Sequence, residues 1–225
     1  MGKINAIITG VGGYVPDYIL TNEELSRMVD TNDEWIMTRV GIKERRILSE
    51  EGLGTSYMAR KAAKQLLQKT GAEPDSIDAI IVSTSTADYH YPSTASIVIG
   101  KLGLKNAFAF DFWAACCGFL YSLDVASSMI QSGRYKRIIV IGADKMSSVT
   151  DYKDRQTCPL FGDGAAAVLL MSEEKANQKE RVRIEVSAIR KYFPKGYTAR
   201  QMEESIINML KERKRQLDRR RDEAR

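Results

Sequence analysis

The sequence predicts an α/β fold, in which helices cover a mostly parallel sheet, over residues 1–171. Short apolar runs rich in Val and Ile alternate with segments whose apolar residues recur at helical spacing. This alternation is typical of layered α/β domains. A chain of 225 residues with 44% hydrophobic and 28% charged residues is also ordinary for a globular protein that buries a sizeable core.

The first expected strand covers residues 4–10 and ends in a glycine-rich turn. Gly10, Gly12 and Gly13 suggest a phosphate-binding loop at first sight. The dinucleotide fingerprint GxGxxG is not met, because position 15 is Val15 and Pro16 follows at once. The sequence therefore disfavours nucleotide binding at this turn.

Two helices are expected before residue 40. Thr21-Asn-Glu-Glu24 has the pattern of a capping box and predicts a helix with Leu25 and Met28 facing inward. Residues 33–39 bring Trp35 and Arg39 close together. From the residues alone, a core tryptophan beside a surface arginine is the default interpretation.

The following elements alternate in type. Residues 55–70 predict a helix that ends at a glycine, residues 77–83 a buried strand, and residues 93–100 the start of another helix. The polar loop between the last two holds His90, the only histidine of the chain. This histidine is either a general base or a loop residue without a catalytic role.

The centre of the chain is the stretch from Asp111 to Phe119. An apolar, aromatic strand is expected before it, at residues 107–110, and an amphipathic helix after it, at residues 120–130. Cys116 and Cys117 thus lie where a strand turns into a helix. The helix dipole and unpaired backbone N–H groups there favour a thiolate and could hold the oxyanion of an attacked thioester. The alternative is that both are small, inert core residues.

The last part of the predicted domain contains two further strands, at residues 137–143 and 165–171. Between them, Asp154 and Arg155 have the pattern of a surface ion pair, and Cys158 is expected in the interior. Asp163 lies between two glycines and is expected to be a turn and packing residue.

Residues 172–225 differ in composition. Residues 1–171 contain 18 Lys+Arg and 19 Asp+Glu, whereas residues 172–225 contain 16 and 10, so the net charge of +5 belongs to the tail. The tail predicts an exposed linker over residues 172–181, a half-exposed strand from residue 182 to 187 and a basic amphipathic helix from about residue 198. It either binds an acidic partner, such as a nucleic acid or an acyl carrier protein, or is a solvated helix.

Several classes of protein are disfavoured. No apolar run is long enough to cross a bilayer, and the amino terminus does not have the pattern of a signal peptide. Three cysteines, two of them adjacent, do not form a disulfide framework. We therefore expect a cytoplasmic protein in a reducing compartment.

Several motifs resemble one known family. Ala114-Ala-Cys-Cys-Gly-Phe119 is similar to the nucleophile motif of β-ketoacyl-acyl-carrier-protein synthase III, a thiolase-fold condensing enzyme. Thr31-Asn-Asp-Glu-Trp-Ile-Met-Thr-Arg-Val-Gly-Ile-Lys-Glu-Arg45 resembles its amino-terminal signature. Asp154-Arg-Gln-Thr157 and Phe161-Gly-Asp-Gly-Ala-Ala-Ala167 resemble another. The resemblance covers residues 1–171, about half of the family's usual length, and implies one half of a thiolase-like fold.

The resemblance also implies roles. Cys116 would carry an acyl group taken from an acyl-coenzyme A, at the start of fatty acid biosynthesis. Trp35, Arg39 and Arg155 would hold the adenine and phosphates of coenzyme A, and Tyr91 would reach across a homodimer interface to the partner's acyl pocket. It implies no metal and no cofactor, since coenzyme A thioester is a substrate. It favours a loop role for His90.

The sequence departs from the family in its second half. There, a His and an Asn support decarboxylation of malonyl-acyl-carrier protein, and neither can be assigned within residues 172–225. We therefore expect a fragment, a fusion, a rearranged gene product or one part of a two-chain enzyme. Two hypotheses remain: an acyltransferase of the synthase III type that is incomplete in this chain, or an inactive half-domain that binds a partner through its basic tail.

Overall fold

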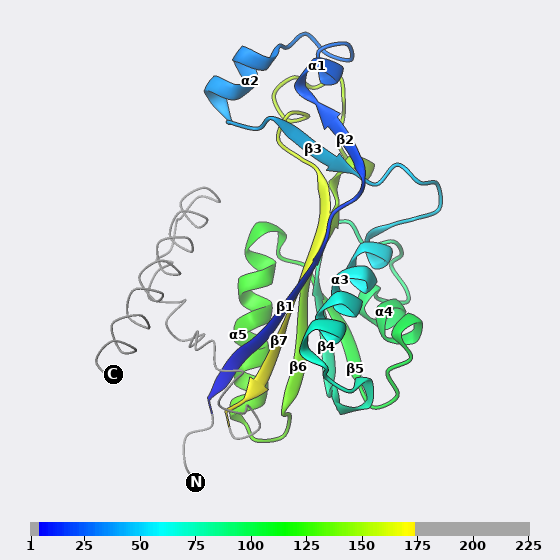
Figure 1. The fold of residues 1–225 in the computed structure, drawn as a ribbon, viewed down its shortest axis with the longest axis vertical. Helices are drawn as coiled ribbons and strands as arrows, with labels where there is room; N and C mark the ends of the chain where they lie inside the picture. Colours follow the sequence, from blue (N-terminus) through cyan, green and yellow to red (C-terminus); the bar gives the residue numbers. More distant parts are fainter. Residues whose placement is uncertain (1–4, 174–225) are drawn as a thin grey trace, which may run out of the picture. The chain divides into compact units, whose positions relative to one another are not determined.

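The computed structural model describes residues 5–173 of the chain (Figure 1). Within them, a five-stranded sheet has the order β1-β7-β6-β4-β5. Its strands are β1 (Ala6–Tyr14), β4 (Ala79–Ser83), β5 (Phe108–Phe112), β6 (Arg137–Lys145) and β7 (Asp163–Ser172). β6, β4 and β5 pair in parallel, whereas β7 pairs antiparallel with both β6 and β1. Four of the strands run in one direction, which confirms the predicted mostly parallel sheet.

Helices cover both faces of this sheet. α3 (Thr55–Thr70) and α4 (Thr94–Leu102) share one buried cluster with Ile80 and Val82 of β4. α5 (Gly118–Gln131) packs against β6 and β4 on the opposite face (Figure 1). There, a Cβ on Gly142 of β6 would lie 3.2 Å from the ring of Phe119. Because β4 is buried on both faces, its Ile and Val side chains each contribute about 1.5–3 kcal/mol to the free energy of unfolding. The layered α/β fold is confirmed.

The glycines of β1 have a packing role. A Cβ on Gly12 would lie 2.5 Å from the carbonyl oxygen of Ala62 and 2.6 Å from the amide nitrogen of Leu66. Both atoms belong to the backbone of α3, so the helix rests directly on the strand. The absence of a side chain at Gly12 therefore allows a close contact between strand and helix.

A smaller layer lies beyond the end of the large sheet (Figure 1). It contains the antiparallel strands β2 (Tyr18–Thr21) and β3 (Glu44–Ile47), with α1 (Asn22–Leu25) and α2 (Asp33–Arg39) between them. Leu20, Leu25, Ile36, Ile47 and Cys158 form its buried core. Cys158 is thus interior, as predicted. Through it, the segment of residues 146–162 packs against this layer.

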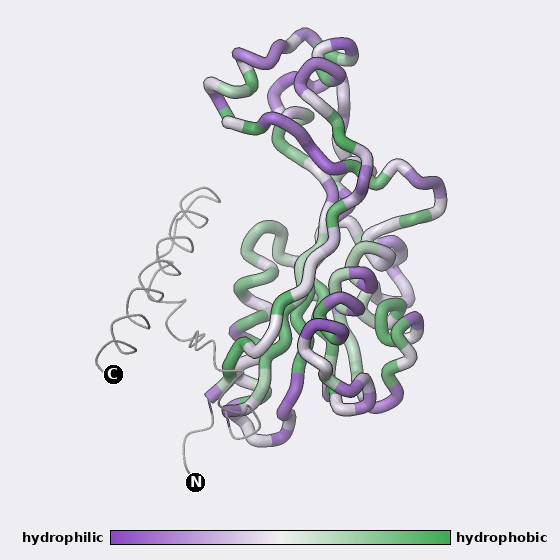
Figure 2. The backbone as a smooth tube through the Cα atoms, viewed as in Figure 1, coloured by the Kyte–Doolittle hydropathy of each residue, from purple (hydrophilic) through white to green (hydrophobic). Residues whose placement is uncertain are grey.

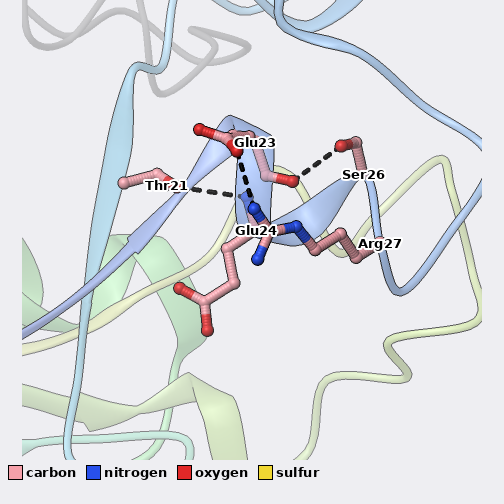
Figure 3. A network of polar contacts seen from close by, with 5 residues as sticks. All are labelled: Thr21, Glu23, Glu24, Ser26 and Arg27. Carbon is pink, nitrogen blue, oxygen red and sulfur yellow. Dashed lines mark hydrogen bonds and ion pairs between the residues drawn. The ribbon is translucent and has the colours of Figure 1, made fainter.

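Thr21 caps the start of α1, which is one half of the predicted capping box, and the helix is only one turn long. Thr21 Oγ1 accepts a hydrogen bond of 3.1 Å from the Glu24 amide, and Arg27 pairs with Glu23 at 2.6 Å (Figure 3). The Glu24 carboxylate accepts from the Tyr18 hydroxyl. Leu25 is buried as expected, whereas Met28 is 49% exposed, so its predicted inward position is wrong.

Hydropathy follows these layers. Figure 2 shows hydrophobic residues along the strands of the large sheet and hydrophilic residues on β3 and α2. Short 3-10 turns, η1 (Pro74–Ser76), η2 (Ala115–Cys117) and η3 (Met146–Ser148), join the elements. β7 extends to Ser172, and the Glu173 amide donates to the Asn5 carbonyl. The linker, strand and helix expected after Glu173 lie outside the described residues.

Candidate active site

Cys116 lies where the sequence predicts it, between a strand and a helix. β5 ends at Phe112, the turn η2 contains Cys116, and α5 begins at Gly118. Ala115 has φ +45°, a left-handed conformation that is uncommon for a residue with a side chain. Cys116 is exposed, Cys117 is half-buried and Cys158 is buried. Cys116 is therefore the most exposed of the three cysteines, and the core alternative does not apply to it.

Gly118 fixes the start of α5 on the sheet. A Cβ there would lie 2.3 Å from Ser83 Oγ, at the carboxyl end of β4. The close approach places the first turn of α5 directly above the carboxyl ends of β4 and β5. In open α/β sheets this edge is where ligands bind. Local packing thus presents Cys116 at the edge of the sheet that is suited to a substrate.

A cavity of about 770 Å³ opens beside Cys116. Its lining is mostly small or apolar, and its larger members are Met146 and Phe161. The remaining lining residues are Ser85, Ala115, Gly142, Ala143, Asp144, Gly162, Gly164, Ala165 and Ala166. Such a lining suits an apolar ligand rather than a charged one.

The sequence motifs include several of the cavity residues, but they assign a role at the site to Cys116 alone. Met146 begins the turn η3 after β6, and Phe161 comes just before β7. Both lie next to strand ends that meet only in the folded protein. One feature of the sequence could have indicated Phe161 as a cavity residue: it comes directly before the Gly-Asp-Gly sequence at the start of β7.

Two buried or half-buried carboxylates shape the loops around the cavity. Asp144 Oδ1 accepts hydrogen bonds from Thr84 Oγ1, the Ser85 amide and Thr86 Oγ1. Asp163 accepts from the Leu48 amide, the Ser147 amide and Ser147 Oγ. Asp163 is 5% exposed. Both carboxylates accept hydrogen bonds from structural donors. Asp163 has the packing role that the sequence predicted, but it is the first residue of β7 and not a turn residue.

The structure brings together Trp35, Arg39 and Arg155. The guanidinium carbon of Arg39 lies 4.6 Å from the centre of the Trp35 ring, and that of Arg155 lies at the same distance. Arg155 also forms an ion pair of 3.6 Å with Asp30, so its ion-pair partner is not Asp154, the partner that the alternative interpretation of the sequence suggested. Asp154 instead accepts hydrogen bonds from Thr157 Oγ1 and from the Gln156 amide, which lower its pKa. We call Trp35, Arg39 and Arg155 the aromatic–arginine cluster.

One segment connects this cluster to the cavity. Residues 146–162 supply Met146 and Phe161 to the cavity and Arg155 to the aromatic–arginine cluster. Two cations beside an indole form a site suited to a phosphorylated aromatic group, because aromatic rings stack and guanidinium groups fork onto phosphate.

His90 and Tyr91 lie in the loop before α4. The ring of His90 stacks on Trp113 at 6.5 Å, and Tyr91 is 91% exposed. Trp113 is itself 59% exposed. The ring of His90 thus packs against a surface tryptophan, as expected for a loop residue.

Across residues 5–173, no group of three or more His, Cys, Asp or Glu side chains is arranged to hold a metal ion. In the same part of the chain, no helix is long and apolar enough to cross a membrane.

Comparison with known proteins finds relatives that have the same description. The family model described as 3-oxoacyl-[acyl-carrier-protein (ACP)] synthase III matches residues 110–188. A β-ketoacyl-[acyl-carrier-protein] synthase III of Phocaeicola vulgatus is 75% identical over 170 residues, which are 76% of this chain and 51% of that protein. A protein of the same name from Porphyromonas gingivalis is 56% identical over 175 residues, 78% of this chain and 52% of the relative.

Solved structures of similar proteins match the same part of the chain. The 3-oxoacyl-[acyl-carrier-protein] synthase III of Aquifex aeolicus VF5 superposes with a TM-score of 0.71 and 50% identity, covering 74% of this chain and 53% of that one. The priming β-ketosynthase of the R1128 polyketide biosynthetic pathway has a TM-score of 0.73 and 35% identity, covering 76% and 51%. The chain therefore spans about half the length of the relatives it matches.

Proposed function

Because the chain belongs to the β-ketoacyl-[acyl-carrier-protein] synthase III family, whose members it matches over about three quarters of its own length, we propose that Cys116 accepts an acyl group from an acyl-coenzyme A. The observation that carries this proposal is the placement of Cys116. It is exposed, it directly precedes the helix α5, and it opens into an apolar cavity of about 770 Å³. A short acyl chain fits a cavity of this size and lining.

The proposed reaction is a thioester exchange. The Cys116 thiolate forms a bond to the carbonyl carbon of the acyl-coenzyme A, and the bond between that carbon and the coenzyme A sulfur breaks. The coenzyme A thiolate leaves and takes up one proton, which balances the proton that Cys116 has lost. The negative charge that develops on the carbonyl oxygen would be held by the backbone N–H of Cys116, because those of Cys117 and Gly118 donate to the Ala114 and Ala115 carbonyls.

The aromatic–arginine cluster is proposed as the site of the coenzyme A nucleotide. Arg39 is exposed, Trp35 and Arg155 are half-buried, and both arginines lie against the same indole. In the proposal the adenine stacks on Trp35, and Arg39 and Arg155 bind phosphate groups. Segment 146–162 then connects the nucleotide to the acyl cavity.

The later step belongs to the proposal for the whole protein. The acyl group on Cys116 would condense with malonyl-acyl-carrier protein, a reaction that in the family needs a His and an Asn outside this matched half. Acyl carrier protein is therefore a proposed partner, and a second copy of the chain is another. The 91% exposure of Tyr91 supports a residue that a partner would cover.

Acylation can be tested directly on the full chain. Incubation with acetyl-coenzyme A should add one acetyl group, and fragmentation of the peptide that contains Cys116 and Cys117 should locate it on Cys116. Cys116→Ser should abolish the adduct, and Cys117→Ser should leave it in place as the matched control. An acetyl group on Cys117, or none on a folded chain, would contradict the proposal.

A further inference from the structure

Arg45 is a buried cation whose contacts reach two separate segments. It lies in β3 and is 4% exposed. Its Nε and Nη2 groups both donate to the carbonyl oxygen of Pro159, at 2.9 and 2.7 Å, and Nη1 donates to Asn22 Oδ1 at 2.5 Å. Burial lowers the pKa of Arg45. Burying a charge is unfavourable, so three well-formed hydrogen bonds are the contacts that offset its desolvation.

Asn22 extends the connection toward α2. It is 3% exposed, and its Nδ2 group donates to Asp33 Oδ1 at 2.7 Å and to the Ile42 carbonyl at 2.9 Å. Asp33 is the first residue of α2. A continuous chain of hydrogen bonds therefore runs from Pro159 through Arg45 and Asn22 to Asp33. We call these four residues the Arg45 relay.

Each end of the Arg45 relay carries part of the aromatic–arginine cluster. Asp33 begins the helix that contains Trp35 and Arg39, and Pro159 belongs to the segment that contains Arg155. The segment that contains Pro159 also packs closely against β3, since a Cβ on Gly162 would lie 3.2 Å from the Cβ of Arg45. The distance between Trp35 and Arg155 thus depends on what holds α2 to residues 146–162.

We infer that Arg45 is a positioning residue, which holds Arg155 against Trp35 through its hydrogen bonds to Pro159 and Asn22. Only a guanidinium can give two parallel N–H groups to the Pro159 carbonyl and a third to Asn22, so a lysine does not replace it. The consequence for coenzyme A rests on the proposed function. The consequence for the Trp35 environment does not.

Fluorescence of Trp35 tests the geometric part. In the full chain with Trp113→Phe, the emission comes from Trp35 alone, because the chain has two tryptophans. Arg45→Lys and Arg45→Met should make Trp35 more accessible to acrylamide quenching, since Arg155 no longer covers its ring. Arg46→Met is the matched control: Arg46 is the next residue of β3, and its guanidinium contacts the Pro16 and Asp17 carbonyls instead.

Binding of coenzyme A, measured by calorimetry in the same background, tests the functional part. Arg45→Lys should raise the dissociation constant roughly tenfold, the size of change expected when a charge-assisted hydrogen bond is lost. Arg46→Met should leave it unchanged. If the parent chain binds no coenzyme A, the proposed function fails and the quenching alone decides the role of Arg45.

Unchanged quenching in a folded Arg45→Lys variant would overturn the inference, even if its melting temperature fell, because Arg45 would then only stabilise the fold. If the Arg45 variants do not fold, Asn22→Ser decides by the same two measurements. This variant breaks the link to α2 and keeps the bonds from Arg45 to Pro159.

Discussion

The carboxylate of Asp163 accepts a hydrogen bond of 2.8 Å from the backbone N–H of Leu48. Leu48 is 2% exposed, and the same carboxylate accepts two hydrogen bonds from Ser147. The Asp163 carboxylate therefore links the start of β7 by hydrogen bonds to the segment after β3 and to the turn η3, which borders the cavity.

Asp163→Ala should lower the free energy of unfolding by on the order of 3 kcal/mol, because it leaves buried N–H donors without an acceptor. Urea denaturation followed by circular dichroism measures this change. Asp75→Ala, at an exposed position in η1, is the control and should change stability by less than about 0.5 kcal/mol. Equal effects of the two substitutions would contradict the structural role of Asp163.

Alkylation rates should rank the three cysteines. At a pH of about 7, iodoacetamide should modify Cys116 first, because it is exposed, whereas Cys117 is half-buried and Cys158 is buried. Cys158 should react last, since burial both shields its thiol and raises its pKa. Peptide mapping over a time course gives the order. Modification of Cys117 as fast as Cys116 would argue against the assignment of the nucleophile.

Tyr14 should make the fold less stable at alkaline pH. Burial, followed by its hydrogen bond with Tyr57, raises the pKa of Tyr14 to about 12, whereas an unfolded tyrosine titrates near 10. The unfolded chain therefore loses its proton first, and the stabilisation present below a pH of about 10 is lost as pH rises to about 12. Tyr14→Phe should flatten this slope in urea titrations, and Tyr91→Phe, at an exposed position, should not.

Substitutions in the aromatic–arginine cluster should weaken the binding of coenzyme A. Trp35→Ala removes the stacking surface, and its effect should depend little on salt. Arg39→Ala removes an ionic contact, so its effect should be larger at low ionic strength. Calorimetry at two salt concentrations separates the two cases. Arg27→Ala, which removes an exposed arginine paired with Glu23, serves as the control.

The chain alone should stop after acylation. The single histidine of the chain stacks on Trp113, and the His and Asn that support decarboxylation in the family have no counterpart in the sequence. Groups that act in the transition state affect rates by factors of roughly a hundred or more. Mass spectrometry should therefore show an acetyl group on Cys116 that persists when malonyl-acyl-carrier protein is added. Steady formation of acetoacetyl-acyl-carrier protein would contradict this expectation.

Local signals predicted the large sheet and its helices well. The helix from Thr55 to Thr70 ends at Gly71, which has φ +64° and is the glycine stop that the sequence indicated. The strands β4, β6 and β7 were visible because their apolar side chains are buried on one or both faces. These features depend on neighbours along the chain, which periodicity reports directly.

The smaller layer could not be predicted in the same way. β3 has the sequence Glu-Arg-Arg-Ile, which does not resemble a buried strand, because the burial of Arg45 depends on Pro159 and Asn22. The stacking of Arg155 on Trp35 likewise joins residues that are far apart in the sequence. For the candidate site, the motif identified Cys116, but the cavity beside it is formed by strand ends that only the fold brings together.

The contact between Gly12 and α3 limits which mutations the gene for this protein can accept. Every missense change in a glycine codon adds at least one carbon atom to the residue. At Gly12 that carbon would meet backbone atoms of Ala62 and Leu66, which have no rotamer to adopt and no side chain to withdraw. A substitution there can be accommodated only if the helix moves away from the strand, so a library made by random mutagenesis should contain few stable variants at this codon.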